Sequence, residues 1–206
     1  MGAEDNVLTR HFQVFLGYHG TEDPDGSLAE AEKLYDILTY KNKVEAFIQT
    51  RFNIKGGYKD TPIVASHSDI LLFVANGNVA VNADGTVAGA DIREELKRFY
   101  ETRVYGEQGG LPRVFACGGL THERASRLHI MFNGVANFRA AEEGEDGSRA
   151  ATLSLLKWLA EVLGRPGDYF DDTIVHFFGE DALPKGRRRS AEKIAPGIPL
   201  GEQEAV

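Results

Sequence analysis

Two adjacent glutamates within residues 91–100 are the first candidates for chemistry, because a helix would place their side chains in different surroundings. Three apolar residues at helical spacing form a stripe that we expect to be buried: Ile92, Leu96 and Phe99. Glu94 then lies on the opposite, solvated face, one turn from its expected partner Arg98. Glu95 lies at the edge of the stripe, where its carboxylate would be partly removed from water.

The expected surroundings of Glu95 make it a candidate catalytic group. Phe99 follows it by one turn and Asp91 precedes it by one turn. An apolar neighbour and a second carboxylate both disfavour ionisation. Carboxylates with perturbed ionisation are common at active sites. The alternative is that Glu95 is an ordinary surface residue beside an apolar stripe.

The elements that must position Glu95 follow an alternating pattern. Apolar runs of strand length alternate with amphipathic segments of helix length, which is typical of α/β proteins with a mostly parallel sheet flanked by helices. The expected strands, about five in number, cover residues 12–16, 44–48, 69–74, 113–117 and 132–135. One expected helix begins at residue 27, a second covers residues 63–68, a third includes residues 91–100 and a fourth covers residues 152–163. Residues 69–74 should form a central strand, because a nearly unbroken apolar run is expected where both sheet faces are covered.

Local chemistry predicts where two of these helices begin. Ser27 and Glu30 have the spacing of a capping box, in which each side chain satisfies a backbone N–H of the first turn. Pro62 suits the first turn of the next helix, where its missing N–H costs nothing. Between these starts, the glycine-bearing residues 53–60 are expected to form a loop.

The composition limits the class of protein. The chain has 206 residues, a formal net charge of −8 and one cysteine, Cys117. The negative charge argues against a protein whose main role is to bind nucleic-acid phosphates. A single cysteine excludes an internal disulfide. Neither a membrane-spanning run nor a secretory leader is evident, so we expect a soluble, cytoplasmic protein without contact to a membrane.

The domain organisation is expected to be simple. Residues 10–180 should form one folded domain, and residues 181–206, rich in proline, glycine and charge, should form a linker or flexible tail. Histidines such as His67 and His122 lack the spacing of metal-ligand motifs, so no metal site is predicted.

The order of the elements and the residues at their ends resemble the Toll/interleukin-1 receptor (TIR) domain, which has a flavodoxin-like fold. The similar segments, in chain order, are residues 14–18, 44–48 with the loop through Gly57 and Tyr58, 63–66, 70–74, Glu95 with Leu96, and 132–134. They resemble the opening strand, the second strand with its so-called BB loop, the short helix, the third strand, the helix-borne Glu-aliphatic pair and a late segment of catalytic members. Gly17 replaces the serine that is common in the opening motif, and Asp91 stands where members often have tryptophan.

The TIR family includes enzymes that cleave NAD between nicotinamide and ribose, and scaffolds that only self-associate. The resemblance implies that Glu95 is the catalytic glutamate of the first class. Cleavage of this bond has a good leaving group and generates a ribosyl cation, so a carboxylate beneath the ribose assists more than a general acid does. The residues assigned to binding NAD lie in loops and at strand ends: Gly17, Tyr18, His19, Gly20, Phe52 and Tyr58.

The hypothesis from sequence is an NAD⁺ glycohydrolase that releases nicotinamide and linear or cyclic ADP-ribose, with NAD as substrate and no cofactor. By resemblance, activity would require homo-oligomeric TIR–TIR assembly, and a linked sensor module in a longer protein could drive it in antiphage defence. The main alternative is a non-catalytic TIR adaptor that acts through homotypic contacts. A remoter alternative is a flavodoxin-like or receiver domain, although a receiver would have clustered acidic residues after the first strand.

Overall fold

A computed structural model gives the fold of the chain, and it describes residues 7–18, 27–52, 54, 57–74, 94–95, 97–99, 101–102, 113–117 and 144–186. The chain divides into two compact units, Met1–Phe170 and Asp171–Val206. The first unit contains the sheet and the candidate site.

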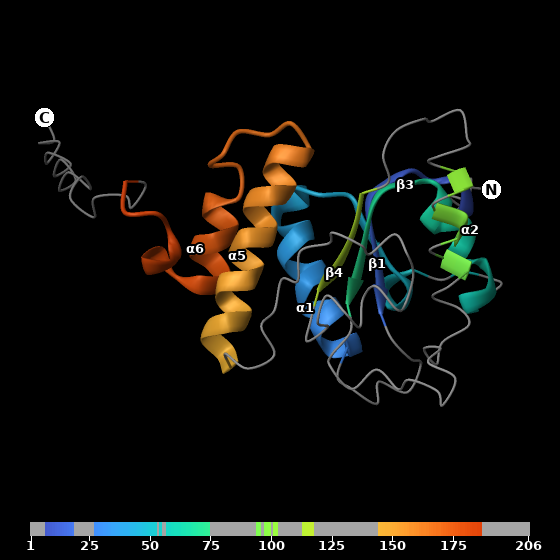
Figure 1. The fold of residues 1–206 in the computed structure, drawn as a ribbon, viewed down its shortest axis with the longest axis horizontal. Coiled ribbons are helices and arrows are strands. Elements are labelled where there is room, and N and C mark those ends of the chain that lie inside the picture. The colour runs from blue at the N-terminus through green and yellow to red at the C-terminus, as the bar shows by residue number, and fades with distance from the viewer. Residues whose placement is uncertain are drawn as a thin grey trace, which may run out of the picture. The chain divides into compact units, whose positions relative to one another are not determined.

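The first unit is built on a parallel sheet (Figure 1). Its strands are β1 (Phe12–Tyr18), β2 (Ala46–Ile48), β3 (Ser68–Val74) and β4 (Arg113–Cys117), in the order β2-β1-β3-β4. All three pairings are parallel, which confirms the predicted α/β class with a parallel sheet. The expected strand at residues 132–135 lies outside the described residues, so four strands are described rather than about five.

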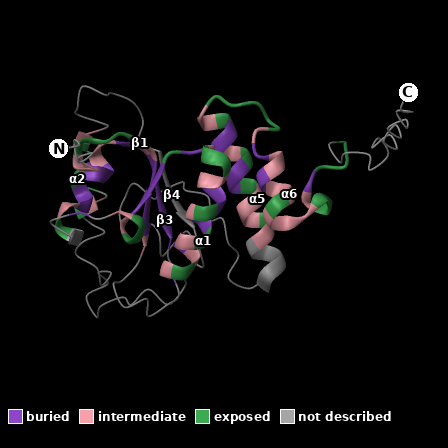
Figure 2. Ribbon diagram, turned by 180° about the vertical axis from the view of Figure 1, so that it is seen from behind, coloured by how far each residue is buried: buried purple, intermediate pink, exposed green. Residues whose placement is uncertain are grey.

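Strands β1 and β3 occupy the middle of this sheet. They are in register from Phe12 opposite Ser68 to Tyr18 opposite Val74, so their carboxyl ends lie side by side. The apolar residues of both strands are buried, as Figure 2 shows in purple. The prediction of a central third strand is therefore confirmed, because an apolar run of this kind can be accommodated only where both faces are covered.

Helices cover the sheet within the first unit. Helix α1 (Ser27–Thr39) contacts β1, β2 and β3, and the short helix α2 (Thr61–Ser66) contacts β1 and β3. Figure 1 shows α1 and α2 on opposite sides of the sheet. Helix α5 (Gly144–Val162) buries one face through Leu155, Leu156, Leu159 and Ala160. Short 3-10 helices occur at Val7–Thr9, Tyr40–Asn42, Gln49–Arg51 and Gly57–Asp60.

The second unit, as far as it is described, contains helix α6 (Asp171–Phe178) and the 3-10 helix Glu180–Ala182. The sequence pattern of residues 168–180 is ambiguous, so it does not predict this helix. No helix among the described residues is both long and apolar enough to cross a membrane.

Several predicted boundaries are wrong. Strand β1 continues through Gly17 to Tyr18, two residues beyond its predicted end, and β3 begins one residue earlier than predicted, at Ser68. Strand β2 is shorter than predicted, since Val44 and Glu45 precede it, although the carbonyl of Glu45 accepts hydrogen bonds from the N–H groups of residues 13 and 14. Helix α2 begins at Thr61 and ends at Ser66, because Ser68 already belongs to β3. Helix α5 begins at Gly144, well before Thr152, and the intervening residues 149–151 (Arg-Ala-Ala) are strong helix formers that extend it.

An aromatic cluster fills one part of the core. Phe47 of β2 stacks on Phe15 of β1, with ring centroids 5.1 Å apart, and on Phe52 at the same distance. The ring of Phe12 contacts Phe47 at 5.4 Å and Phe52 at 5.3 Å. The cluster fixes β2 and the residues that follow it against the central strand.

A second contact joins two distant segments of the first unit. Lys43 donates a hydrogen bond to the carbonyl of Tyr169, and the Tyr169 hydroxyl donates one to the carbonyl of Lys43 at 2.7 Å. The ammonium group of Lys43 also lies 4.6 Å from the centroid of the Tyr169 ring. These contacts hold the segment that follows α5 against the one that follows α1.

Candidate active site

The helical residues around Glu95 show the predicted division of side chains. Phe99 is fully buried, and Glu94 is exposed and pairs with Arg98 at 3.5 Å. Glu95 is only partly buried. These observations confirm the predicted burial of Phe99 and the different surroundings of the two glutamates, while Ile92 and Leu96, the other two residues of the predicted stripe, lie outside the described residues.

Thr61 holds one oxygen of the Glu95 carboxylate. Its hydroxyl donates a hydrogen bond to Oε1 of Glu95, with the two oxygens 2.6 Å apart. Thr61 is the first residue of α2 and is only 1% exposed. Pro62 lies in the first turn of α2, where its ring fixes the backbone angle that a helix start requires. The start of α2 therefore places a buried donor beside Glu95.

Because Gly17 has no side chain, there is room beside it for Oε2, the other carboxylate oxygen of Glu95. A methyl group built on Gly17 would lie 3.3 Å from Oε2 of Glu95, 3.5 Å from Cδ2 of Phe73 and 3.6 Å from Cε1 of Phe15. Gly17 and Phe73 are paired near the carboxyl ends of β1 and β3. The carboxylate thus lies against the ends of the two central strands, at a position that a larger side chain on residue 17 would crowd. We call Gly17, Thr61 and Glu95 the carboxyl-end site.

The carboxyl-end site contains one electrostatic contribution that the sequence did not indicate. The neighbours expected there were Phe99 and Asp91, both of which disfavour ionisation, and Asp91 lies outside the described residues. The Thr61 hydroxyl acts in the opposite direction, since a donor to a carboxylate stabilises its charged form. A charged, oriented carboxylate can stabilise a developing positive charge, and partial burial strengthens that interaction.

The residues predicted to bind NAD lie in different parts of the structure, and some lie outside its described residues. Gly17 is in the site and Tyr18, the last residue of β1, is partly buried next to it in sequence. Phe52 packs in the aromatic cluster, which agrees with a core role, and its assignment to NAD binding stays a prediction. Tyr58 lies in the 3-10 helix that leads into Thr61, and its side chain is outside the described part of the structure. His19 and Gly20 also lie outside it.

Thr61 is the site residue that sequence reasoning missed. It was recognised only as the start of a helix. A threonine that begins a helix just before a central strand is also close to the carboxyl end of the preceding strand when the sheet is parallel, and this placement could have suggested a role.

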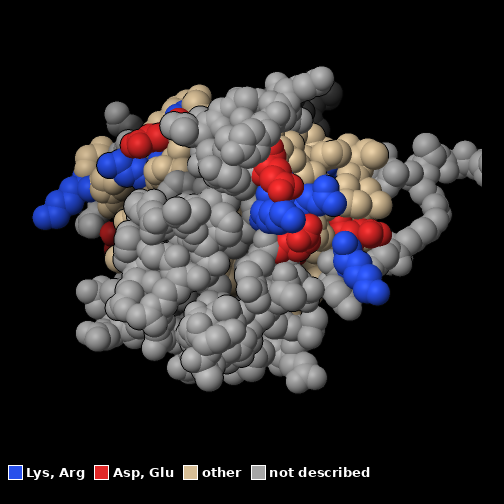
Figure 3. All heavy atoms as spheres, turned by 45° about the vertical axis from the view of Figure 1, so that its right-hand side comes forward, with Lys and Arg blue, Asp and Glu red and all other residues tan. Residues whose placement is uncertain are grey.

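The charged residues of the described surface indicate no dominant ligand class. Figure 3 shows acidic and basic side chains of described residues next to one another on the face in view. Within the described ranges, no three His, Cys, Asp or Glu side chains gather in a way that could hold a metal ion.

Comparisons of the chain with known protein families, with characterised proteins and with solved structures find no match. The residues and geometry of the carboxyl-end site are therefore the basis for inferring a function.

Proposed function

We propose that the protein is a TIR-type NAD⁺ glycohydrolase in which Glu95 is the catalytic carboxylate. The observation on which this proposal depends is the position of that carboxylate. One oxygen is hydrogen-bonded to the buried Thr61, and the other lies against Gly17 at the carboxyl ends of β1 and β3.

The topology of the sheet supports this location for a ligand. The order β2-β1-β3-β4 matches the first four strands of the flavodoxin-like order, and a fifth strand would complete a TIR fold. In open α/β sheets of this order, the strand order reverses between β1 and β3: β2 is added on one side of β1, and β3 and β4 on the other. Ligands bind outside the carboxyl ends of the strands at this switch point, which is where Glu95 lies.

The chemistry requires little beyond a fixed negative charge. The bond between the ribose C1′ and the nicotinamide nitrogen breaks, and its electron pair leaves with nicotinamide. The ribosyl group becomes cationic, and the Glu95 carboxylate can stabilise it and accept hydrogen bonds from ribose hydroxyls. Water then attacks C1′ and loses a proton to give ADP-ribose, or a nitrogen of the adenine attacks to give a cyclic product.

The proposal also covers where the protein acts and what activates it. The protein would act in the cytoplasm, and contacts between TIR domains of a homo-oligomer would complete its site. A linked sensor module could drive that assembly in response to phage infection. An isolated domain at low concentration would then show weak activity.

Chromatography of the products formed from NAD, at several protein concentrations and under conditions that favour self-association, tests this proposal. We expect nicotinamide and linear or cyclic ADP-ribose, with a rate per protein molecule that rises with protein concentration. Self-association without any release of nicotinamide would instead support the TIR adaptor and would reject the enzyme.

A further inference from the structure

We propose that Thr61 is the positioning residue for the Glu95 carboxylate. This inference rests on the proposed function, since it assigns a role within the same site. Thr61 would not touch NAD. It would fix Oε1 of Glu95 so that the carboxylate is oriented before the substrate binds.

The geometry of the contact fits such a role. The Thr61 hydroxyl and Oε1 are 2.6 Å apart, which is at the short end of the range for O–H···O⁻ hydrogen bonds. Thr61 is 1% exposed, so water does not compete freely for its hydroxyl. Because Thr61 begins α2 and α2 contacts β1 and β3, the donor is fixed to the same strands that end beside the carboxylate.

Gly17 leaves room for the other oxygen of the same carboxylate. A carboxylate with free rotation would sample several orientations, and each would place its negative charge differently relative to a ribose. The hydrogen bond from Thr61 to Oε1 limits that rotation, and the missing side chain at residue 17 lets Oε2 occupy its position in this orientation. The hydroxyl at residue 61 and the glycine at residue 17 thus favour the same orientation of the carboxylate.

The chain contains a matched control for this contact. Thr50 donates a hydrogen bond to Oε1 of Glu32 at 2.8 Å, in an exposed position and to a carboxylate other than that of Glu95. Thr50→Val removes the same kind of hydrogen bond as Thr61→Val, with the same change of shape. If kcat falls in Thr61→Val and not in Thr50→Val, the cause is the loss of the contact to Glu95 and not merely the loss of a threonine hydroxyl.

The test measures kcat and KM for NAD in the full chain under assembly conditions. We expect Thr61→Val to lower kcat by about tenfold to a hundredfold, with KM changed by less than about threefold, as for a lost hydrogen bond to a charged group. Thr61→Ser keeps the hydroxyl and should retain kcat within about threefold, and Thr50→Val should match the parent. A parent-like kcat in Thr61→Val, or an equal loss in Thr61→Ser, would overturn the positioning role.

A second measurement separates this inference from the proposed function. The carboxyl ¹³C signal of Glu95 can be identified by its loss in Glu95→Gln, and amide spectra report whether each variant is folded. The signal should move in Thr61→Val and stay at the parent position in Thr61→Ser. An unmoved signal in folded Thr61→Val rejects the positioning role, whereas a parent chain that releases no nicotinamide rejects the enzyme and leaves the result on Thr61 intact. If Thr61→Val does not fold, the folded Thr61→Ser variant decides: a displaced Glu95 signal there rejects the role.

Discussion

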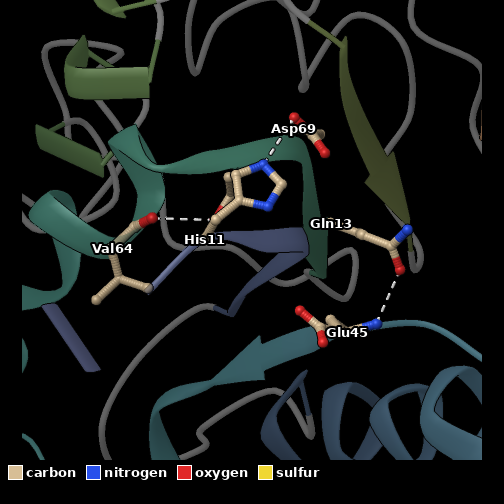
Figure 4. A network of polar contacts seen from close by, with 6 residues as sticks. His11, Gln13, Glu45, Val64 and Asp69 are labelled. Atoms are coloured by element: carbon tan, nitrogen blue, oxygen red, sulfur yellow. Dashed lines mark hydrogen bonds and ion pairs between the residues drawn. The ribbon is translucent and has the colours of Figure 1, made fainter. Parts of the chain in front are cut away.

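Carboxylates at the two ends of the central strands differ in how far their contacts are exposed to water. At the carboxyl ends, Glu95 accepts a hydrogen bond of 2.6 Å from Thr61, which is 1% exposed. At the amino ends, the carboxylate of Asp69 lies 3.1 Å from the His11 ring, and these side chains are 37% and 54% exposed (Figure 4). Both contacts join segments that are distant in sequence, but water reaches only one of them freely.

The difference shows that burial, and not the presence of a carboxylate, distinguishes a candidate site from a surface contact. Exposed ion pairs contribute little, because water and salt screen them and long side chains lose freedom when they pair. A second amino-end contact in Figure 4, from the N–H of Glu45 to Oε1 of Gln13 at 3.0 Å, is exposed as well. The Ser68 hydroxyl, which donates to the carbonyl of Val64 at 3.0 Å, is buried and involves no carboxylate. We therefore expect substitutions of Glu95, Thr61 and Gly17 to affect activity, and substitutions of the exposed amino-end residues His11 and Asp69 to affect neither activity nor stability strongly.

The largest effect is expected from Glu95→Gln, which preserves shape and removes charge. It should lower the rate of nicotinamide release by about a hundredfold to a thousandfold, the usual loss when a group that stabilises transition-state charge is removed. The matched control is Glu94→Gln on the same helical segment, where the side chain is exposed and pairs only at the surface with Arg98. Its rate should stay within about twofold of the parent. Equal rates for both variants would remove the distinction between the two glutamates.

A smaller effect is expected from Gly17→Ala. The new methyl group would lie 3.3 Å from Oε2 of Glu95, so the carboxylate must move by a few tenths of an ångström. We expect kcat to fall by about threefold to thirtyfold, because small displacements of a reacting group are costly. Gly186→Ala is the control, since nothing lies within 4 Å of its added methyl group. Steady-state kinetics of both variants measure this, and a parent-like Gly17→Ala enzyme would show that Oε2 needs no such space.

The smallest effect is expected from Asp69→Asn at the amino ends. It removes the charge that faces His11, yet both side chains are more than one-third exposed. The free energy of unfolding should change by less than about 1 kcal/mol and the rate of nicotinamide release by less than about twofold. Urea denaturation and the same NAD assay measure the two quantities. A clearly larger loss of either would show that the amino ends also matter to the site.

Much of the fold could be predicted from the sequence, because its determinants are local. The apolar run at 69–74 indicated a central strand, and helical spacing alone separated Glu94 from Glu95 and buried Phe99. Element ends were predicted less well. Arg149, Ala150 and Ala151 favour a helix that begins before Thr152, but the start at Gly144 does not follow from propensity, since Gly144 and Gly147 are poor helix formers.

The site was predicted only in part, because its geometry depends on contacts that sequence spacing does not show. Thr61 and Glu95 are 34 residues apart and meet only through the packing of two helical segments on the sheet. Gly17 was expected to allow close approach of a ligand, whereas the structure shows Glu95 itself in the space above it. The absence of a side chain at residue 17 thus has a physical consequence, room for the Glu95 carboxylate, that sequence spacing did not indicate.

The most direct test of the account is a crystal structure of Glu95→Gln with bound NAD, because this variant should bind the dinucleotide without cleaving it. We predict that the ribose joined to nicotinamide lies at the carboxyl ends of β1 and β3, within hydrogen-bond distance of the residue 95 amide and next to Gly17. NAD bound elsewhere on the protein, with residue 95 remote from that ribose, would contradict the assignment of Glu95 as the catalytic carboxylate.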